Sequence, residues 1–199
     1  MHLDDLPLPD TPAARAAVEV ARRFHSPAFV NHGLRSYLWA AAAARTQGLA
    51  VDDELLFVSA VLHDLGLEAP FDSHTLPFEE AGGLVAWVFA AGAGWSEQRR
   101  DRAAEIIVAH MADAVDPAVD AEGHLLEIAT GLDISGRHAE AWDAGLRAEV
   151  LAAYPRLTLA DEFLVCLADQ AARKPHSAAG AAIASGLPAR LAANPLDRR

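Results

Sequence analysis

Two residues whose side chains bind metal ions, His63 and Asp64, follow each other near the end of a strongly apolar stretch, residues 58–67. The helix predicted to lead into them, residues 53–65, has small or apolar residues on nearly every side, which is typical of a buried helix. A buried carboxylate without a partner is costly, and such groups are paired or bind a metal. A cation between the imidazole and the carboxylate would satisfy both. The alternative to a metal site is that His63 and Asp64 are a surface pair at the end of an ordinary helix.

Two other stretches carry residues of the same types. His32 lies at the start of another apolar helix upstream, and Asp133 is an isolated acid within the apolar helical run 125–136. The order along the chain is therefore His32, His63-Asp64, Asp133. Two imidazoles and two carboxylates suit a divalent ion such as Zn²⁺, Fe²⁺ or Mn²⁺, and a thiolate site is excluded because no cysteine lies near these residues. The sequence predicts a divalent metal site, with Zn²⁺ as the first choice of ion.

With this ligand order the chain resembles the HD-domain superfamily of metal-dependent hydrolases, whose motif is a His, then a His-Asp pair, then a distant Asp. The flanking residues resemble its cyanamide hydratase branch. The matching stretches are 31–39, 62–66, 78–82, 106–110, 131–136 and 173–175. The resemblance implies an all-α fold, a compact HD-domain helical bundle with a mononuclear metal site in its core. It also implies a hydratase (a lyase) or hydrolase that adds metal-activated water to a small nitrile-like substrate, as when cyanamide becomes urea.

The resemblance assigns roles to further residues. In HD proteins with two metals, a His at the place of His110 binds the second ion, and another His stands where this chain has Phe78. Because that second His is missing, we expect one metal ion and assign His110 to catalysis. Glu79, at the start of a helix, and the free oxygen of Asp64 are the other candidates for moving a proton. The plainer alternative for His110 is a packed histidine in the core.

The expected substrate pocket is built from residues flanking the motifs: His74, Phe78, Arg35 and Lys174. Arg35, one turn beyond His32, has the alternative of pairing with a carboxylate, and Lys174 that of capping a helix end. Asp169, in a Leu-Ala-Asp context, is the rival of Asp133 for the last ligand position.

Three other functions stay open at this point. An HD phosphohydrolase acting on a nucleotide or other phosphate ester would need several Arg and Lys near the metal, and the motif segments contain few. A non-catalytic helical binding domain would have no need for all four ligand residues. An oxygenase with two irons is disfavoured by Phe78.

Composition sets the wider limits. The chain has 199 residues, of which 52% are apolar, and it has few runs with strand-like alternation, so helices packed on helices in one domain are expected. The net charge of −12 argues against nucleic acid as a partner. The single cysteine, Cys166, suits a reducing compartment. With neither a signal peptide nor a membrane span in view, we expect a cytoplasmic protein with a small-molecule substrate, and a homodimer stays open.

Helical patterns, and the capping residues, glycines and prolines that bound them, divide the chain into elements. Helices are predicted over 12–24, 28–47, 53–65, 78–91, 96–111, 122–134, 139–154 and 158–172. The N-terminal helix, 12–24, precedes the motif-bearing core, about 25–176, in a single domain over 1–199. The tail, 177–199, is small, polar and interrupted by proline, so it is predicted to be loosely ordered.

Overall fold

The computed structural model describes residues 1–197, and these residues form α-helices and short 3-10 turns without any strand. The helices are α1 (Pro12–Phe24), α2 (Pro27–Gln47), α3 (Asp53–Leu62), α4 (Phe78–Gly92), α5 (Glu97–Ala109), α6 (Ala121–Ser135), α7 (Ala144–Ala153), α8 (Leu159–Arg173), α9 (Ala178–Ala184) and α10 (Leu187–Ala192). The 3-10 turns are η1 (Leu3–Asp5), η2 (Leu65–Leu67), η3 (Ala139–Ala141) and η4 (Pro195–Asp197). The predicted all-α fold is confirmed.

The helices start where the sequence supplies a polar cap. In most of them a Ser, Thr or Asp side chain accepts a hydrogen bond from the backbone N–H three residues later, which satisfies one of the free donors at a helix start. These caps are Thr11, Ser26, Asp52, Ser96, Asp120, Asp143 and Ser177. The predicted limits of the first two helices are therefore met within one residue.

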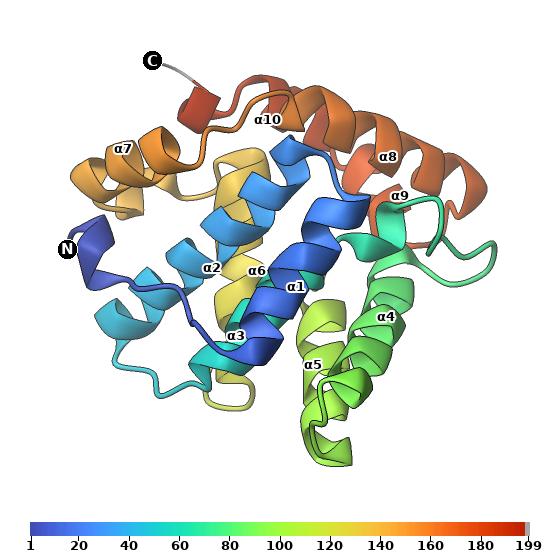
Figure 1. The fold of residues 1–199 in the computed structure, drawn as a ribbon. Coiled ribbons are helices and arrows are strands. Elements are labelled where there is room, and N and C mark those ends of the chain that lie inside the picture. Colours follow the sequence, from blue (N-terminus) through green and yellow to red (C-terminus); the bar gives the residue numbers. More distant parts are fainter. Residues whose placement is uncertain (198–199) are drawn as a thin grey trace.

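Helix α2 crosses the middle of the molecule and packs against α3 and α6 (Figure 1). Its side chains are buried almost without interruption from Ala28 to Ala44, because neighbours cover it on all sides. Helix α1 packs on α3, and the antiparallel pair α4–α5 packs on η2 and α3. The central helices α2, α3 and α6 thus bring together three stretches that are far apart in the sequence.

The backbones of α2 and α3 approach closely beside Gly33. A Cβ atom at this position would lie 3.0 Å from the carbonyl oxygen of Ala60 and 3.1 Å from the Cα atom of Val61. Both atoms belong to the backbone, so a larger residue would push the helices apart. This close approach places His32 opposite His63.

Gly33→Ala is expected to destabilise the protein by about 1–3 kcal/mol, because an extra methyl group in a packed contact between backbones forces a shift. The same shift moves His32 away from His63 and should weaken metal binding. Gly92→Ala is the matched control, since nothing lies within 4 Å of a Cβ there. Urea denaturation of both variants measures the difference, and equal midpoints would show that the approach of α2 to α3 is not tight.

The C-terminal segment, predicted to be loosely ordered, forms helices α9 and α10 and the turn η4 up to residue 197; residues 198 and 199 lie outside the described part. Helices α9 and α10 pack against α8, and Leu187, Leu191 and Leu196 are buried. The side chain of Asn194 donates hydrogen bonds to the backbone carbonyls of Asp133 (3.0 Å) and Ile134 (2.9 Å). The tail is held because it satisfies the free carbonyls at the end of α6.

Within residues 1–197, none of the helices has the length and apolar character that crossing a lipid bilayer requires.

Candidate metal centre

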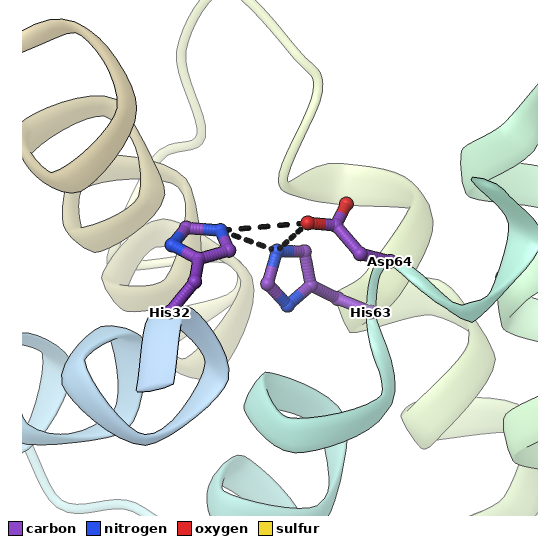
Figure 2. Close-up of side chains that lie close together, drawn as sticks. All are labelled: His32, His63 and Asp64. Carbon is purple, nitrogen blue, oxygen red and sulfur yellow. Dashed lines mark hydrogen bonds and ion pairs between the residues drawn. The ribbon is translucent and has the colours of Figure 1, made fainter. Parts of the chain in front are cut away.

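His32, His63 and Asp64 converge on one point in the core, as Figure 2 shows. His32 comes from the first turns of α2, whereas His63 and Asp64 lie directly after the last residue of α3. The Nε2 atoms of the two histidines are 3.1 Å apart, and the Oδ2 atom of Asp64 lies 3.2 Å from His63 Nε2 and 3.5 Å from His32 Nε2. All three residues are at most 2% exposed.

The turn that carries His63 and Asp64 is packed against the start of α4. A Cβ atom at Gly66 would lie 2.0 Å from the carbonyl oxygen of Phe78, so only glycine allows this contact. The predicted helix 53–65 ends earlier, at Leu62, and the chain bends at Asp64 into η2. The bend turns the Asp64 carboxylate toward the two imidazoles.

Both imidazoles present a lone pair to this point. The Nδ1 atom of His63 lies 2.7 Å from the carbonyl oxygen of Ala60, which only accepts hydrogen bonds, so Nδ1 carries the proton. The Nδ1 atom of His32 lies 2.7 Å from Oδ2 of Asp133, an ionised carboxylate, so it also carries the proton. In the neutral tautomers, both Nε2 atoms are therefore acceptors that face each other.

With both imidazoles neutral, three acceptors face each other here, and no other side chain of residues 1–197 donates a hydrogen bond between them. Both oxygens of Asp64 are buried without a hydrogen-bond partner among the described residues. Burial would raise the pKa of Asp64, but His63 and His32 hold it below its usual range, so the carboxylate is charged. Burial lowers the pKa of His63, but the same carboxylate raises it, so the three groups together favour a positive charge between them. Without a metal, a proton on His63 Nε2 supplies this charge, and a metal ion would take the place of that proton. A metal cation satisfies all three groups at once.

The spacing of the three atoms fits a tetrahedral ion. Zinc binds histidine nitrogen and carboxylate oxygen at about 2.0–2.2 Å, which puts two ligands of a tetrahedron about 3.4 Å apart. The observed separations of 3.1, 3.2 and 3.5 Å match this value. Three protein ligands also leave a coordination position for water or substrate, as in catalytic zinc sites.

Asp133, the fourth predicted ligand, lies behind His32 and outside this group of three. Its Oδ1 atom accepts from Nε of Arg35 (2.8 Å) and Nε1 of Trp39 (3.1 Å), and its Oδ2 atom accepts from Nη2 of Arg35 (2.7 Å) and from His32. Burial would raise the pKa of Asp133, but Arg35 and His32 hold it well below its usual range. Both oxygens are thus occupied, and Asp133 fixes the orientation and tautomer of His32. The rival candidate Asp169 pairs with Arg173 near the surface.

His110, at the end of α5, packs its ring edge against His63, with the ring centroids 4.8 Å apart. Its Nδ1 atom donates to the carbonyl of Ile107, which leaves Nε2 as an acceptor. Burial, together with the neighbouring His63, lowers the pKa of His110 to about 3. The imidazole is therefore neutral near pH 7, and its Nε2 atom can accept a hydrogen bond. Phe78 stacks edge-on against its other side, with the centroids 5.7 Å apart.

A cavity of about 650 Å³ opens above these residues and is lined by His32, His63, Asp64 and His110 at its base. One face of α6 forms a wall, with Glu127, Thr130, Gly131 and Ile134 at the spacing i, i+3, i+4, i+7. Sequence reasoning missed this wall, although the spacing could have indicated it once Asp133 was singled out. Glu127 is buried and pairs with Arg137, which also lines the cavity.

The structure places five predicted site residues outside the lining of this cavity: Glu79, His74, Phe78, Arg35 and Lys174. Arg35 is committed to Asp133 and to the backbone carbonyl of Tyr154 (2.9 Å). Lys174 donates to the carbonyl of Leu76 (2.7 Å) and ties the loop before α4 to α8, and His74 in that loop is exposed.

Glu79 is buried beside the start of α4, and one of its carboxylate oxygens has no hydrogen-bond partner among the described residues. Burial raises the pKa of Glu79.

Comparison with known proteins adds an independent observation. The chain is similar to two cyanamide hydratases. These are cyanamide hydratase DDI2 and cyanamide hydratase DDI3 of Saccharomyces cerevisiae, and each is 27% identical over 175 residues, which cover 85% of this chain and 77% of the relative. No family model matches the chain. Similarity to hydratases was expected and is confirmed at this level, whereas membership of the HD-domain superfamily stays a prediction.

Proposed function

We propose that the chain is a metal-dependent hydratase that adds water to the carbon–nitrogen triple bond of a small nitrile-like substrate, as in the conversion of cyanamide to urea. The observation that carries this proposal is the convergence of three acceptors, His32, His63 and Asp64, without a donor at the base of a cavity. The similarity to the two yeast hydratases supports the choice of reaction. His32, His63 and Asp64 would hold a divalent ion, with Zn²⁺ as the first choice, and this ion would lower the pKa of a bound water molecule toward about 7.

The residues around the ion have separate tasks in this reaction. In the overall reaction a C=O double bond forms, both C–N π bonds of the nitrile break, and the two protons of water end on nitrogen. His110 lines the cavity and has a lone pair on Nε2, and we propose that it takes a proton from water and passes it to the substrate nitrogen. Its low pKa makes it a weak base that gives this proton up readily. Asp133 keeps His32 in the tautomer that leaves Nε2 free. Glu127 lines the same cavity and can accept a hydrogen bond from an amino group of the substrate.

The second candidate is hydrolysis of a phosphate ester, which one observation favours. Two guanidinium groups that sequence reasoning did not assign to the site, Arg137 and Arg190, line the cavity. Arg137 is paired with Glu127, and Arg190 donates to Ser185. One guanidinium without a carboxylate partner is less than the several cations that a nucleotide phosphate chain calls for, so we rank this function second.

Turnover assays on one zinc-loaded preparation separate these functions. The parent protein is expected to release urea from cyanamide and no phosphate from nucleoside monophosphates. Phosphate release without urea would replace the first function by the second. If the protein binds zinc but turns over neither substrate, the remaining function is that of a non-catalytic binding domain.

His110→Gln is expected to lower kcat for cyanamide by about 10²–10⁴-fold, the usual contribution of a general acid or base. Zinc content should stay at the level of the parent, because His110 lies outside the group of three ligands. Steady-state kinetics and elemental analysis of the same sample test both statements. Loss of zinc together with activity would instead make His110 a ligand.

A further inference from the structure

The cavity above the three ligands is much larger than cyanamide. Cyanamide has three non-hydrogen atoms, which at about 30 Å³ each, the share of a water molecule in the liquid, amount to roughly 90 Å³. The cavity measures about 650 Å³ and lies in the range of sites for larger ligands, about 300–1,000 Å³. Asp64, whose two oxygens are buried without partners, lines it and marks its reactive end. Most of the space is therefore free when the reacting C≡N group sits at the ligands.

Part of the remaining wall is apolar, although Glu127, Arg137 and Arg190 also line the cavity. Met111 after α5, Ile134 of α6, Phe163 of α8 and Leu187 of α10 contribute large apolar side chains. Facing them, α9 presents Ala178, Ala181 and Ala182, which are spaced i, i+3, i+4 and so lie on one face of this helix. Helices α9 and α10 run beside α8 at the C-terminal end of the molecule (Figure 1). Because alanine side chains end at Cβ, this face of α9 is apolar and leaves space in the cavity for a ligand group.

We propose that the substrate carries an apolar alkyl or aryl group, as in an N-substituted cyanamide R–NH–C≡N, and that this group packs on the alanine face of α9. This inference rests on the proposed hydratase function. The reaction balances as R–NH–C≡N + H₂O → R–NH–CO–NH₂: the nitrile carbon gains the oxygen as a C=O double bond, both C–N π bonds of the nitrile break, and both hydrogens of water end on the former nitrile nitrogen. The substituent R takes no part in bond changes and contributes binding only.

A homologous series measures this contribution. Each buried CH₂ group contributes about 0.8 kcal/mol, or about a fourfold change in an equilibrium constant. We expect kcat/KM to rise about fourfold per methylene from cyanamide through N-ethyl- to N-butylcyanamide. Calorimetric binding of the products urea, N-ethylurea and N-butylurea to the zinc-loaded protein should show the same trend and does not need turnover.

A pair of variants on one helix locates the effect. Ala182→Trp places a large ring in the cavity and is expected to remove the rise with chain length, in kcat/KM and in urea binding. Ala184→Trp is the matched control, because Ala184 is exposed on the same helix and does not line the cavity. It should keep the rise with chain length.

The outcomes separate this inference from the function on which it rests. Alkylureas that bind more tightly with length, without turnover of any cyanamide, would keep the apolar site and overturn the hydratase. Turnover of cyanamide with equal or falling kcat/KM for longer substrates would keep the hydratase and overturn the apolar site. If Ala182→Trp still shows the rise with chain length, the alkyl group does not pack on α9, and this part of the proposal is overturned.

Discussion

His63→Ala is expected to lose bound zinc and to lower cyanamide hydration to the rate of the metal-free protein. His63 supplies one of three ligand atoms, and its Nδ1–H is already fixed by Ala60, so no neighbouring group can take its place. The loss of zinc affinity should exceed the roughly 10–100-fold that removal of a supporting partner costs. Elemental analysis after gel filtration and a urea assay provide the two measurements.

His176→Ala is the control for this variant. His176 is an exposed histidine outside the cavity, so its removal should change neither zinc content nor rate. Treating the parent with a chelator should reproduce the His63→Ala phenotype, and added zinc should restore the parent alone. Full activity of His63→Ala would mean that the three acceptors are not the site of the reaction.

Arg35→Met is expected to destabilise the zinc-free protein by about 3–5 kcal/mol, the usual cost of removing one partner from a buried ion pair. Arg35 and Asp133 are both 0% exposed and share two hydrogen bonds of 2.8 and 2.7 Å. Without the Arg35 guanidinium, the Asp133 carboxylate would keep hydrogen bonds from His32 and Trp39 and a longer ion pair of 3.6 Å with Arg156. Urea denaturation in the presence of chelator measures the change without a contribution from bound metal.

Two further variants test the cause of this loss. Arg22→Met removes an exposed arginine of α1 and should stay within about 0.5 kcal/mol of the parent. Adding Asp133→Asn to Arg35→Met should recover part of the lost stability, because no buried charge then lacks a partner. If Arg35→Met is as stable as Arg22→Met, the pair does not hold α2 to α6.

The convergence of His32, His63 and Asp64 could be predicted from sequence because each residue carries a local signal. His63 and Asp64 end an apolar helix, and His32 starts another, so a polar side chain at either place needs a partner in the core. The fold class could be predicted for a related reason, since caps such as Thr11 and Ser26 and the helical spacing of apolar residues are local.

The role of Asp133 could not be predicted from sequence in the same way. The order of the motif residues predicts that Asp133 lies near His32. It does not predict which ring nitrogen of His32 the carboxylate contacts. The deciding contact comes from Arg35, which lies one turn beyond His32 and 98 residues from Asp133. Competition between a guanidinium and a metal ion for one carboxylate depends on tertiary geometry.

The tail and the cavity walls depend on long-range packing in the same way. Alanine, glycine and serine from residue 177 onward have little apolar surface of their own, which is why the segment was expected to be loose. Its order comes from leucines buried against α8 and from Asn194 on the end of α6. The walls of the cavity follow from this docking, so α9 and Arg190 could not be assigned to the site from their local sequence.

The most direct test of the three-ligand centre is the zinc affinity of the parent, Asp64→Asn and Asp133→Asn, measured by competition with a chromophoric chelator. We expect the parent to bind about one zinc ion per chain and Asp64→Asn to bind none at matched concentration, because a ligand oxygen is lost. Asp133→Asn should still bind about one ion, with affinity lowered by about 10–100-fold, because only the support of His32 is weakened. A parent without zinc, or an Asp133→Asn variant as empty as Asp64→Asn, would contradict this account.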